Sequence, residues 1–107
     1  MSLTPFEIMR WEDKALPSLD FLVRMLEREG LQAVQSELPP KTHSPEIKFI
    51  QPVVRVVVSG KVQYSFPGYG VIELEPGDIL EISPGVLHDV IVESHQPALV
   101  LEATRPA

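Results

Sequence analysis

The chain has 107 residues, a formal net charge of −6 at pH 7 and no Cys. A chain of this length forms one domain that can bury enough surface to fold unaided, and the lack of Cys excludes disulfides, thiolate catalysis and Cys-ligated metal centres. The acidic balance argues against a nucleic-acid partner, which needs clustered Lys and Arg, and no apolar run reaches the roughly 20 residues of a membrane helix.

Residues 1–17 are expected to form an N-terminal extension ahead of a single domain over residues 18–104. The extension carries the apolar side chains of Phe6, Ile8 and Trp11, which would leave aromatic surface in water if they had no partner. We therefore predict a dimer-interface strand in this segment and a homodimer. The first eleven residues do not resemble a secretory signal, which predicts a cytoplasmic protein.

Residues 18–38 are compatible with two structures. Leu19, Leu22 and Leu26 would suit one face of a helix over residues 19–29, and periodicity does not exclude it. The Arg28-Glu29-Gly30-Leu31 stretch, however, has the composition of a tight reversal between residues 22–27 and 32–38. We therefore expect an antiparallel hairpin here, with the helix as the alternative.

Short strands separated by turns are predicted over the rest of the chain. Eleven Pro divide the sequence into short pieces and exclude a helical bundle. From Val53 onward, β-branched residues and alternating patterns are interrupted by Gly- and Pro-containing turns. The predicted strands are 53–58, 62–66, 71–75, 79–83, 88–93 and 99–102. This spacing indicates an all-β sandwich or barrel.

One motif is more specific than composition. The stretch GDILEISPGVLH, residues 77–88, resembles the second signature of the cupin superfamily, Gly-x5-Pro-x-Gly-x2-His. Gly77, Gly85 and His88 fall on the family positions, while Ser83 stands where the family has Pro and Pro84 follows one place later. The resemblance covers residues 31–102. It implies a cupin-like jelly-roll barrel, or double-stranded β-helix, with His88 directed inward as a metal ligand.

The first cupin signature, His-x-His-x3–4-Glu-x6-Gly, matches less well. Gly60 fits its closing glycine, but Val53 stands where the metal-binding Glu is expected. The nearest candidates for the missing ligands are His43, which lies several residues too early in a Pro-rich segment, and Glu46, which falls on a family His position for one length of the gap. Together with His88 they could hold one divalent metal ion, because such sites need three or four protein ligands. The alternative is that His43 and Glu46 lie on the solvated surface and bind no metal.

Arg55 has two alternative orientations. On the family register Val53, Arg55 and Val57 face the barrel interior, where a guanidinium would favour an anion over a cation. If Val54, Val56 and Val58 face inward instead, Arg55 lies outside, because a shift of one residue exchanges the faces. Tyr64 could line the pocket mouth or belong to the core.

Three functions follow from this sequence. The first is a small-molecule-binding cupin that holds a small polar or anionic metabolite near His88, with Arg55 and Tyr64 as further ligand-binding residues. The second is a divalent-metal-dependent enzyme of oxygenase or isomerase type that uses His43, Glu46 and His88. The third is a structural or regulatory barrel without a ligand. Fold alone does not choose among them.

Overall fold

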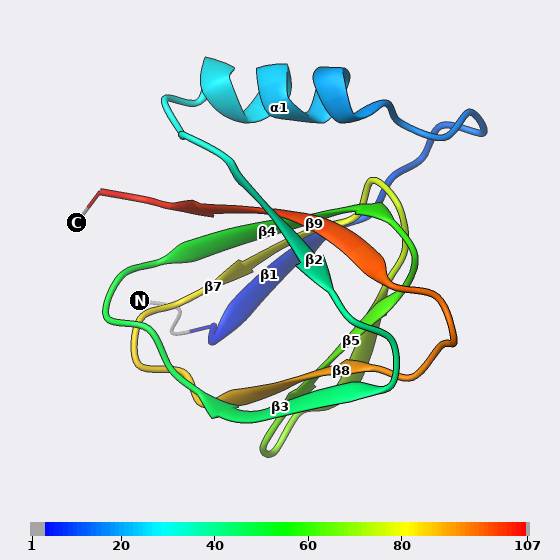
Figure 1. Ribbon diagram of the computed structural model, residues 1–107. Helices are drawn as coiled ribbons and strands as arrows, with labels where there is room; N and C mark the ends of the chain where they lie inside the picture. Colours follow the sequence, from blue (N-terminus) through cyan, green and yellow to red (C-terminus); the bar gives the residue numbers. More distant parts are fainter. Residues whose placement is uncertain (1–3, 107) are drawn as a thin grey trace.

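The structure, a computed structural model, describes residues 4–106. In this part of the chain nine strands form two antiparallel sheets that face each other, and one helix lies outside them (Figure 1). The five-stranded sheet has the order β1-β7-β4-β9-β2 and the four-stranded sheet the order β3-β8-β5-β6. The elements are β1 Phe6–Met9, α1 Leu19–Arg28, β2 Val34–Leu38, β3 Thr42–Ile47, β4 Val53–Ser59, β5 Val62–Phe66, β6 Gly70–Leu74, β7 Ile79–Ile82, β8 His88–Val92 and β9 Ala98–Thr104.

The space between the two sheets is filled by apolar side chains from both of them. Successive residues of a strand point to opposite faces, so the five residues of β5 alternate between buried and half-buried. The fully or nearly fully buried members of this inner core are Val57, Val62, Tyr64, Phe66, Leu74, Leu80, Ile82, Val90, Val92, Ala98 and Val100. The predicted all-β jelly-roll barrel is confirmed.

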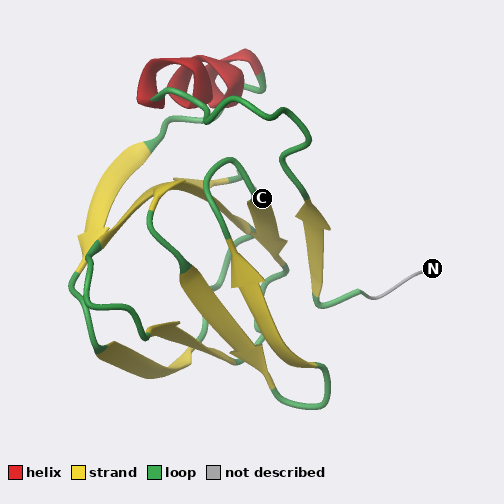
Figure 2. Ribbon diagram, turned by 90° about the vertical axis from the view of Figure 1, so that its right-hand side faces the viewer, coloured by secondary structure: helices red, strands yellow, loops and turns green. Residues whose placement is uncertain are grey.

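A second, smaller core lies on the outer face of the five-stranded sheet. Helix α1 covers this face from outside the barrel (Figure 2). Its buried residues Leu22 and Leu26 pack with Leu31 against outward side chains of β4 and β9, namely Val54, Val56, Leu101 and Ala103. Strand β4 is therefore buried on both faces, which explains its continuous run of apolar residues.

The hairpin predicted over residues 22–38 is wrong, and the helical alternative is correct. The helix begins after Ser18, whose hydroxyl accepts a hydrogen bond from the Phe21 N–H at 3.1 Å. This is an N-cap, which stabilises a helix by about 1 kcal/mol. The Leu22 and Leu26 side chains then bury one helical face.

The segment expected to reverse a hairpin ends the helix instead. Gly30 has a φ of +77°, and its N–H donates to the Glu27 carbonyl at 2.9 Å. The Leu31 N–H donates to the Leu26 carbonyl at 3.0 Å, and the two leucines share the outer core. These two bonds form the Schellman motif, in which glycine takes the left-handed position.

The N-terminal segment is built into the barrel. Strand β1 pairs with β7, and the Phe6 ring stacks on Phe66 with centroids 4.2 Å apart. The backbone N–H of Trp11 donates to Asp78 Oδ1 at 2.9 Å. The Trp11 indole covers Gly77 so closely that a Cβ on Gly77 would collide with it. The domain boundary at residue 18 therefore does not separate β1 from the sheet.

The homodimer stays a prediction. The aromatic and apolar side chains that suggested it, those of Phe6, Ile8 and Trp11, all pack within their own chain. In the described range, 4–106, the one helix is too short and too polar to cross a membrane.

Candidate functional site

Arg55 lies on the inner face of β4. Its neighbours Val54 and Val56 belong to the outer core under α1, whereas Val57 belongs to the inner core. Arg55 shares the parity of Val57, and its side chain contacts residues inside the barrel. The structure thus adopts the first of the two registers left open by the sequence.

The Arg55 guanidinium is almost completely buried, with 5% of the residue exposed. Its Cζ lies 5.4 Å from the centroid of the Phe49 ring and 5.9 Å from that of Tyr64, within the range of cation–π attraction. Its carboxylate contact is Glu102, with Nη2 and Oε2 3.6 Å apart. Within residues 4–106 the Arg55 Nε is buried and has no hydrogen-bond partner.

His88 opens β8 and is completely buried. Aromatic rings surround its imidazole, with centroids at 5.7 Å for Phe49, 6.4 Å for Tyr64 and 5.6 Å for Phe66. Its Nδ1 lies 3.0 Å from the Val86 carbonyl. Because a carbonyl can only accept, Nδ1 carries the hydrogen, and the neutral ring keeps a lone pair on Nε2.

Burial lowers the pKa of His88 below its ordinary value, and the nearby positive charge of Arg55 acts in the same direction. The imidazole is therefore neutral at pH 7. Its Nε2 is buried without a partner in the described part of the chain.

Tyr64 lies between these two residues and is also fully buried. Burial raises the pKa of its hydroxyl, although the Arg55 guanidinium opposes that shift, so the hydroxyl keeps its proton at neutral pH. The Arg55 guanidinium lies near enough to interact with this hydroxyl and lower its pKa, but the two do not meet in ordinary hydrogen-bond geometry, and no other group of residues 4–106 bonds the hydroxyl.

Three strands thus bring together Arg55, Tyr64 and His88, which we call the inner cluster. Each contributes one buried polar atom that lacks a partner among residues 4–106, and these three are the buried side-chain atoms of which this is true. Native proteins pair the large majority of such atoms, so a concentration of exceptions requires an explanation. The cluster offers two kinds of donor, guanidinium and hydroxyl, and one acceptor, the His88 Nε2.

A hollow of about 430 Å³ lies at the end of the barrel where β4 begins and β9 ends. Its lining includes Phe49 and Glu102, the two residues that also contact Arg55. The remaining lining residues are Gln32, Val34, Val53, Ala103 and Thr104. The hollow therefore adjoins the inner cluster, with the Phe49 ring between them.

The predicted metal ligands are not brought together. His43 lies on the outer face of the four-stranded sheet, where its Nε2 is 2.8 Å from the Asp89 carboxylate. Asp89 follows His88 in β8 and therefore faces the opposite way. Glu46 is exposed, with a φ of +54°, and its backbone N–H donates to Asp89 at 3.0 Å.

The inner cluster also fails to fit a divalent metal ion on chemical grounds. One imidazole falls short of the three or four ligands that such ions need, and the Arg55 guanidinium beside it repels a cation. Among residues 4–106 no group of three His, Cys, Asp or Glu side chains could hold a metal.

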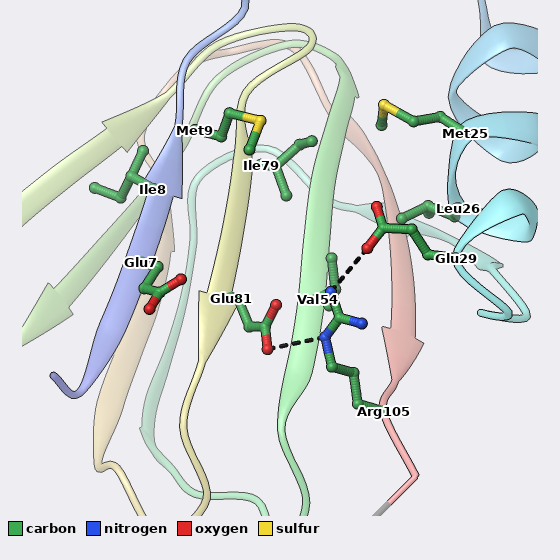
Figure 3. Close-up of a pocket in the computed structure, with 10 residues that line it drawn as sticks. All are labelled: Glu7, Ile8, Met9, Met25, Leu26, Glu29, Val54, Ile79, Glu81 and Arg105. Carbon is green, nitrogen blue, oxygen red and sulfur yellow. Dashed lines mark hydrogen bonds and ion pairs between the residues drawn. The ribbon is translucent and has the colours of Figure 1, made fainter. Parts of the chain in front are cut away.

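A second cavity, the outer groove, lies between α1 and the strands β1, β7 and β4 (Figure 3). Arg105 reaches into it and donates from Nε to Glu81 at 2.9 Å and from Nη2 to Glu29 at 3.0 Å. Apolar side chains, including Val54 and Ile79, also line it. Because Arg105 is paired with a carboxylate of β7 and one at the end of α1, it links the helix to the sheet.

Phe49 and Glu102 were not predicted from the sequence. Glu102 pairs with Arg55 across the β4–β9 ladder, so an inward Arg55 implies an inward Glu102. Alternation with the inner-core residues Ala98 and Val100 carries the same information. Phe49 lies in the irregular link between β3 and β4, where no periodicity identifies its direction.

The chain matches no family model, and none of the curated proteins resembles it in sequence. Solved structures do resemble it in fold. A cupin 2 domain-containing protein from Halorhodospira halophila superposes with a TM-score of 0.70 at 17% identity, over 94% of this chain and 75% of that one. An uncharacterized protein with a double-stranded β-helix domain from Klebsiella pneumoniae gives 0.60 at 21% identity, over 69% of this chain and 65% of that one.

The DMSP lyase DddQ from Ruegeria pomeroyi also shares the fold, with a TM-score of 0.64 at 20% identity. The match covers 71% of this chain and 38% of the lyase. This chain therefore spans less than two thirds of the length of the lyase and of the Klebsiella protein. At these identities the likeness concerns the fold alone.

Proposed function

We propose that this chain, whose fold is that of the cupin superfamily, binds a small carboxylate inside the barrel at the inner cluster. The observation that supports the proposal is the convergence of three buried polar atoms, on Arg55, Tyr64 and His88, that find no partner within residues 4–106. Leaving such an atom unpaired costs about 1–3 kcal/mol. A ligand that pairs them recovers this free energy on binding.

The chemistry of Arg55 favours an anion. A guanidinium presents its N–H groups in a planar fork that matches a carboxylate, and two such bonds form together. Its own carboxylate neighbour, Glu102, is 3.6 Å away and contacts Nη2, so the Nε edge is free to bind another acceptor. The protonated Tyr64 hydroxyl supplies a further donor nearby.

The adjoining hollow gives the ligand a route of approach. Glu102 and Phe49 line that hollow, and both touch Arg55. The Glu102 side chain is 32% exposed, so water compensates its charge when a ligand takes over part of the guanidinium. The proposal requires no metal, in keeping with the donor set of the cluster.

Thermal unfolding with propanoate tests this function. Propanoate should raise the melting temperature in a saturable way, because a ligand that binds the native state stabilises it. Arg55→Met should remove this response. Arg105→Met, which alters the arginine of the outer groove, should keep it. A protein that shows no response, or an equal response in Arg55→Met, would contradict the proposal.

A further inference from the structure

We infer that the carboxylate ligand also carries a hydrogen-bond donor, a hydroxyl or an ammonium group, that reaches His88. This inference rests on the proposed function, and it deepens that proposal by naming the ligand class. It follows from the third member of the inner cluster, His88, which accepts where the other two donate.

The acceptor character of His88 is determined by the backbone. The Val86 carbonyl, 3.0 Å from Nδ1, holds the hydrogen on that nitrogen and leaves the lone pair on Nε2. Nε2 is buried and, within residues 4–106, has no donor to satisfy it. A plain carboxylate has acceptors alone, so it would leave this lone pair unpaired and facing negative charge.

The spacing of the cluster limits where the donor can sit. The Arg55 Cζ is 5.9 Å from the centre of the Tyr64 ring, and the Tyr64 and His88 rings are 6.4 Å apart. Tyr64 thus adjoins both Arg55 and His88, so the carboxylate and the donor bind within one small cluster. A short hydroxy acid or amino acid carries both groups.

The two Phe rings beside His88 cannot satisfy Nε2. Phe49 and Phe66 flank the imidazole with centroids at 5.7 Å and 5.6 Å, and neither ring can donate a conventional hydrogen bond. The third neighbouring ring, that of Tyr64, carries a hydroxyl, but this hydroxyl does not bond Nε2. We therefore assign the donor to the ligand. The aromatic walls also restrict its remaining substituents to small apolar groups.

Titration calorimetry at pH 7.5 with propanoate, lactate and alanine tests the ligand class. The three share a three-carbon carboxylate and differ in the group on the adjacent carbon. Lactate or alanine should bind roughly tenfold more tightly than propanoate, as expected when a buried acceptor gains its partner. A hydroxyl ligand is indicated if lactate binds best, and an ammonium ligand if alanine does.

His88→Phe should abolish this preference, because the ring is kept and the acceptor is lost. His43→Phe is the matched control: it alters a histidine on the outer face of the same sheet and should keep the preference. If the unmodified protein binds propanoate and both donor-bearing acids equally, the ligand class is wrong while the carboxylate site stands. If none of the three binds, the carboxylate site itself is wrong.

A second measurement avoids any effect of His88→Phe on folding. The ¹⁵N resonance of the His88 Nε2 in the unmodified protein should shift when lactate or alanine is added, because Nε2 then accepts a hydrogen bond. Propanoate should leave it nearly unchanged. A shift of equal size with all three acids, or preference retained in a folded His88→Phe protein, would overturn the inference.

Discussion

Two arginines lie on opposite faces of the five-stranded sheet, and their surroundings differ. Arg105, on the outer face, is 34% exposed and donates to two carboxylates, Glu81 and Glu29, at 2.9 Å and 3.0 Å. Arg55, on the inner face, is buried and has Glu102 as its carboxylate contact at 3.6 Å. The same residue type is thus satisfied in one place and poorly satisfied in the other.

The difference separates structure from function. A paired, partly exposed arginine joins elements at little cost, as Arg105 joins the helix to β7. A buried and incompletely paired arginine lowers stability and so requires an explanation, and the one that we propose is a ligand that completes its bonding. The inner cluster is therefore expected to respond to ligand and the outer layer to determine stability.

The largest expected effect is on the outer layer. Leu26→Ala should lower the free energy of unfolding by about 2–5 kcal/mol, because it leaves a cavity beneath α1 where the side chain is 1% exposed. Urea unfolding measures this loss, with the exposed Glu27→Ala as a control near zero. The propanoate response should survive. A loss below 1 kcal/mol would mean that the helix does not pack on the sheet as described.

The two arginines themselves provide the next test. Arg55→Met combined with Glu102→Leu should raise the free energy of unfolding of the ligand-free protein by about 1–4 kcal/mol, as replacing a buried ion pair by apolar side chains often does. Arg105→Met should lower it by up to about 1 kcal/mol. Urea unfolding without ligand compares them. If the Arg55→Met, Glu102→Leu variant is less stable than Arg105→Met, the Arg55–Glu102 pair is structural and the contrast between the two arginines disappears.

Acid should act on the inner cluster first. The pKa of His88 lies below its ordinary value of 6.5, mainly because of burial, so the unfolded chain takes up the proton before the native one. Stability should fall as the pH drops from about 6.5 toward the pKa of the folded protein, by at most about 1.4 kcal/mol per pH unit. His88→Phe should flatten this part of the profile.

Asp89 affects stability at a lower pH than His88 does. Hydrogen bonds to its carboxylate, and not burial, lower its pKa. The Glu46 N–H and then His43 hold the pKa of Asp89 below its ordinary value of 3.8. The stability that Asp89 contributes is therefore present above about 3.8 and is lost as the pH falls through the folded pKa. The difference between the unfolding curves of the unmodified protein and of His88→Phe, measured between pH 7.5 and 5, isolates the contribution of His88. A profile unaltered by His88→Phe in that range would show that its imidazole is not buried in the neutral form.

The smallest effect is expected at Tyr64. Tyr64→Phe removes one hydroxyl that has no partner within residues 4–106 and should change the free energy of unfolding by less than about 1 kcal/mol. A paired hydroxyl in a core would cost more when deleted. The same variant should weaken propanoate binding about fivefold to tenfold, as calorimetry can show. Unchanged binding would remove Tyr64 from the site.

Much of the barrel could be predicted because its signals are local. Turn residues and β-branched runs mark each strand, and the spacing from Gly77 to His88 corresponds to a turn, a strand and a bend. The segment after Ser18 was harder, since its glycine suits a hairpin turn and a helix end equally. Burial of Leu22 and Leu26 under tertiary packing decides for the helix.

The site was predictable only in part. His88 follows from the motif, but the direction of Arg55 depends on which face of β4 meets α1, and the sequence pattern favours a hairpin over that helix. His43 is close to His88 in the sheet and still on the wrong face, because neighbouring positions of β8 point to opposite sides. Phe49 acts from an irregular segment, where sequence pattern carries no directional signal.

The position of Phe49 affects the rate at which a ligand can bind. Its ring lies against both Arg55 and His88, at the boundary between the hollow and the inner cluster. A molecule entering from the hollow must wait until the ring moves aside, and motions of such connecting segments take nanoseconds to microseconds. Opening on this timescale is faster than ligand encounter at ordinary concentrations, so the association rate should rise linearly with ligand concentration. Its rate constant should lie below the diffusion limit in proportion to the fraction of time for which the ring is open.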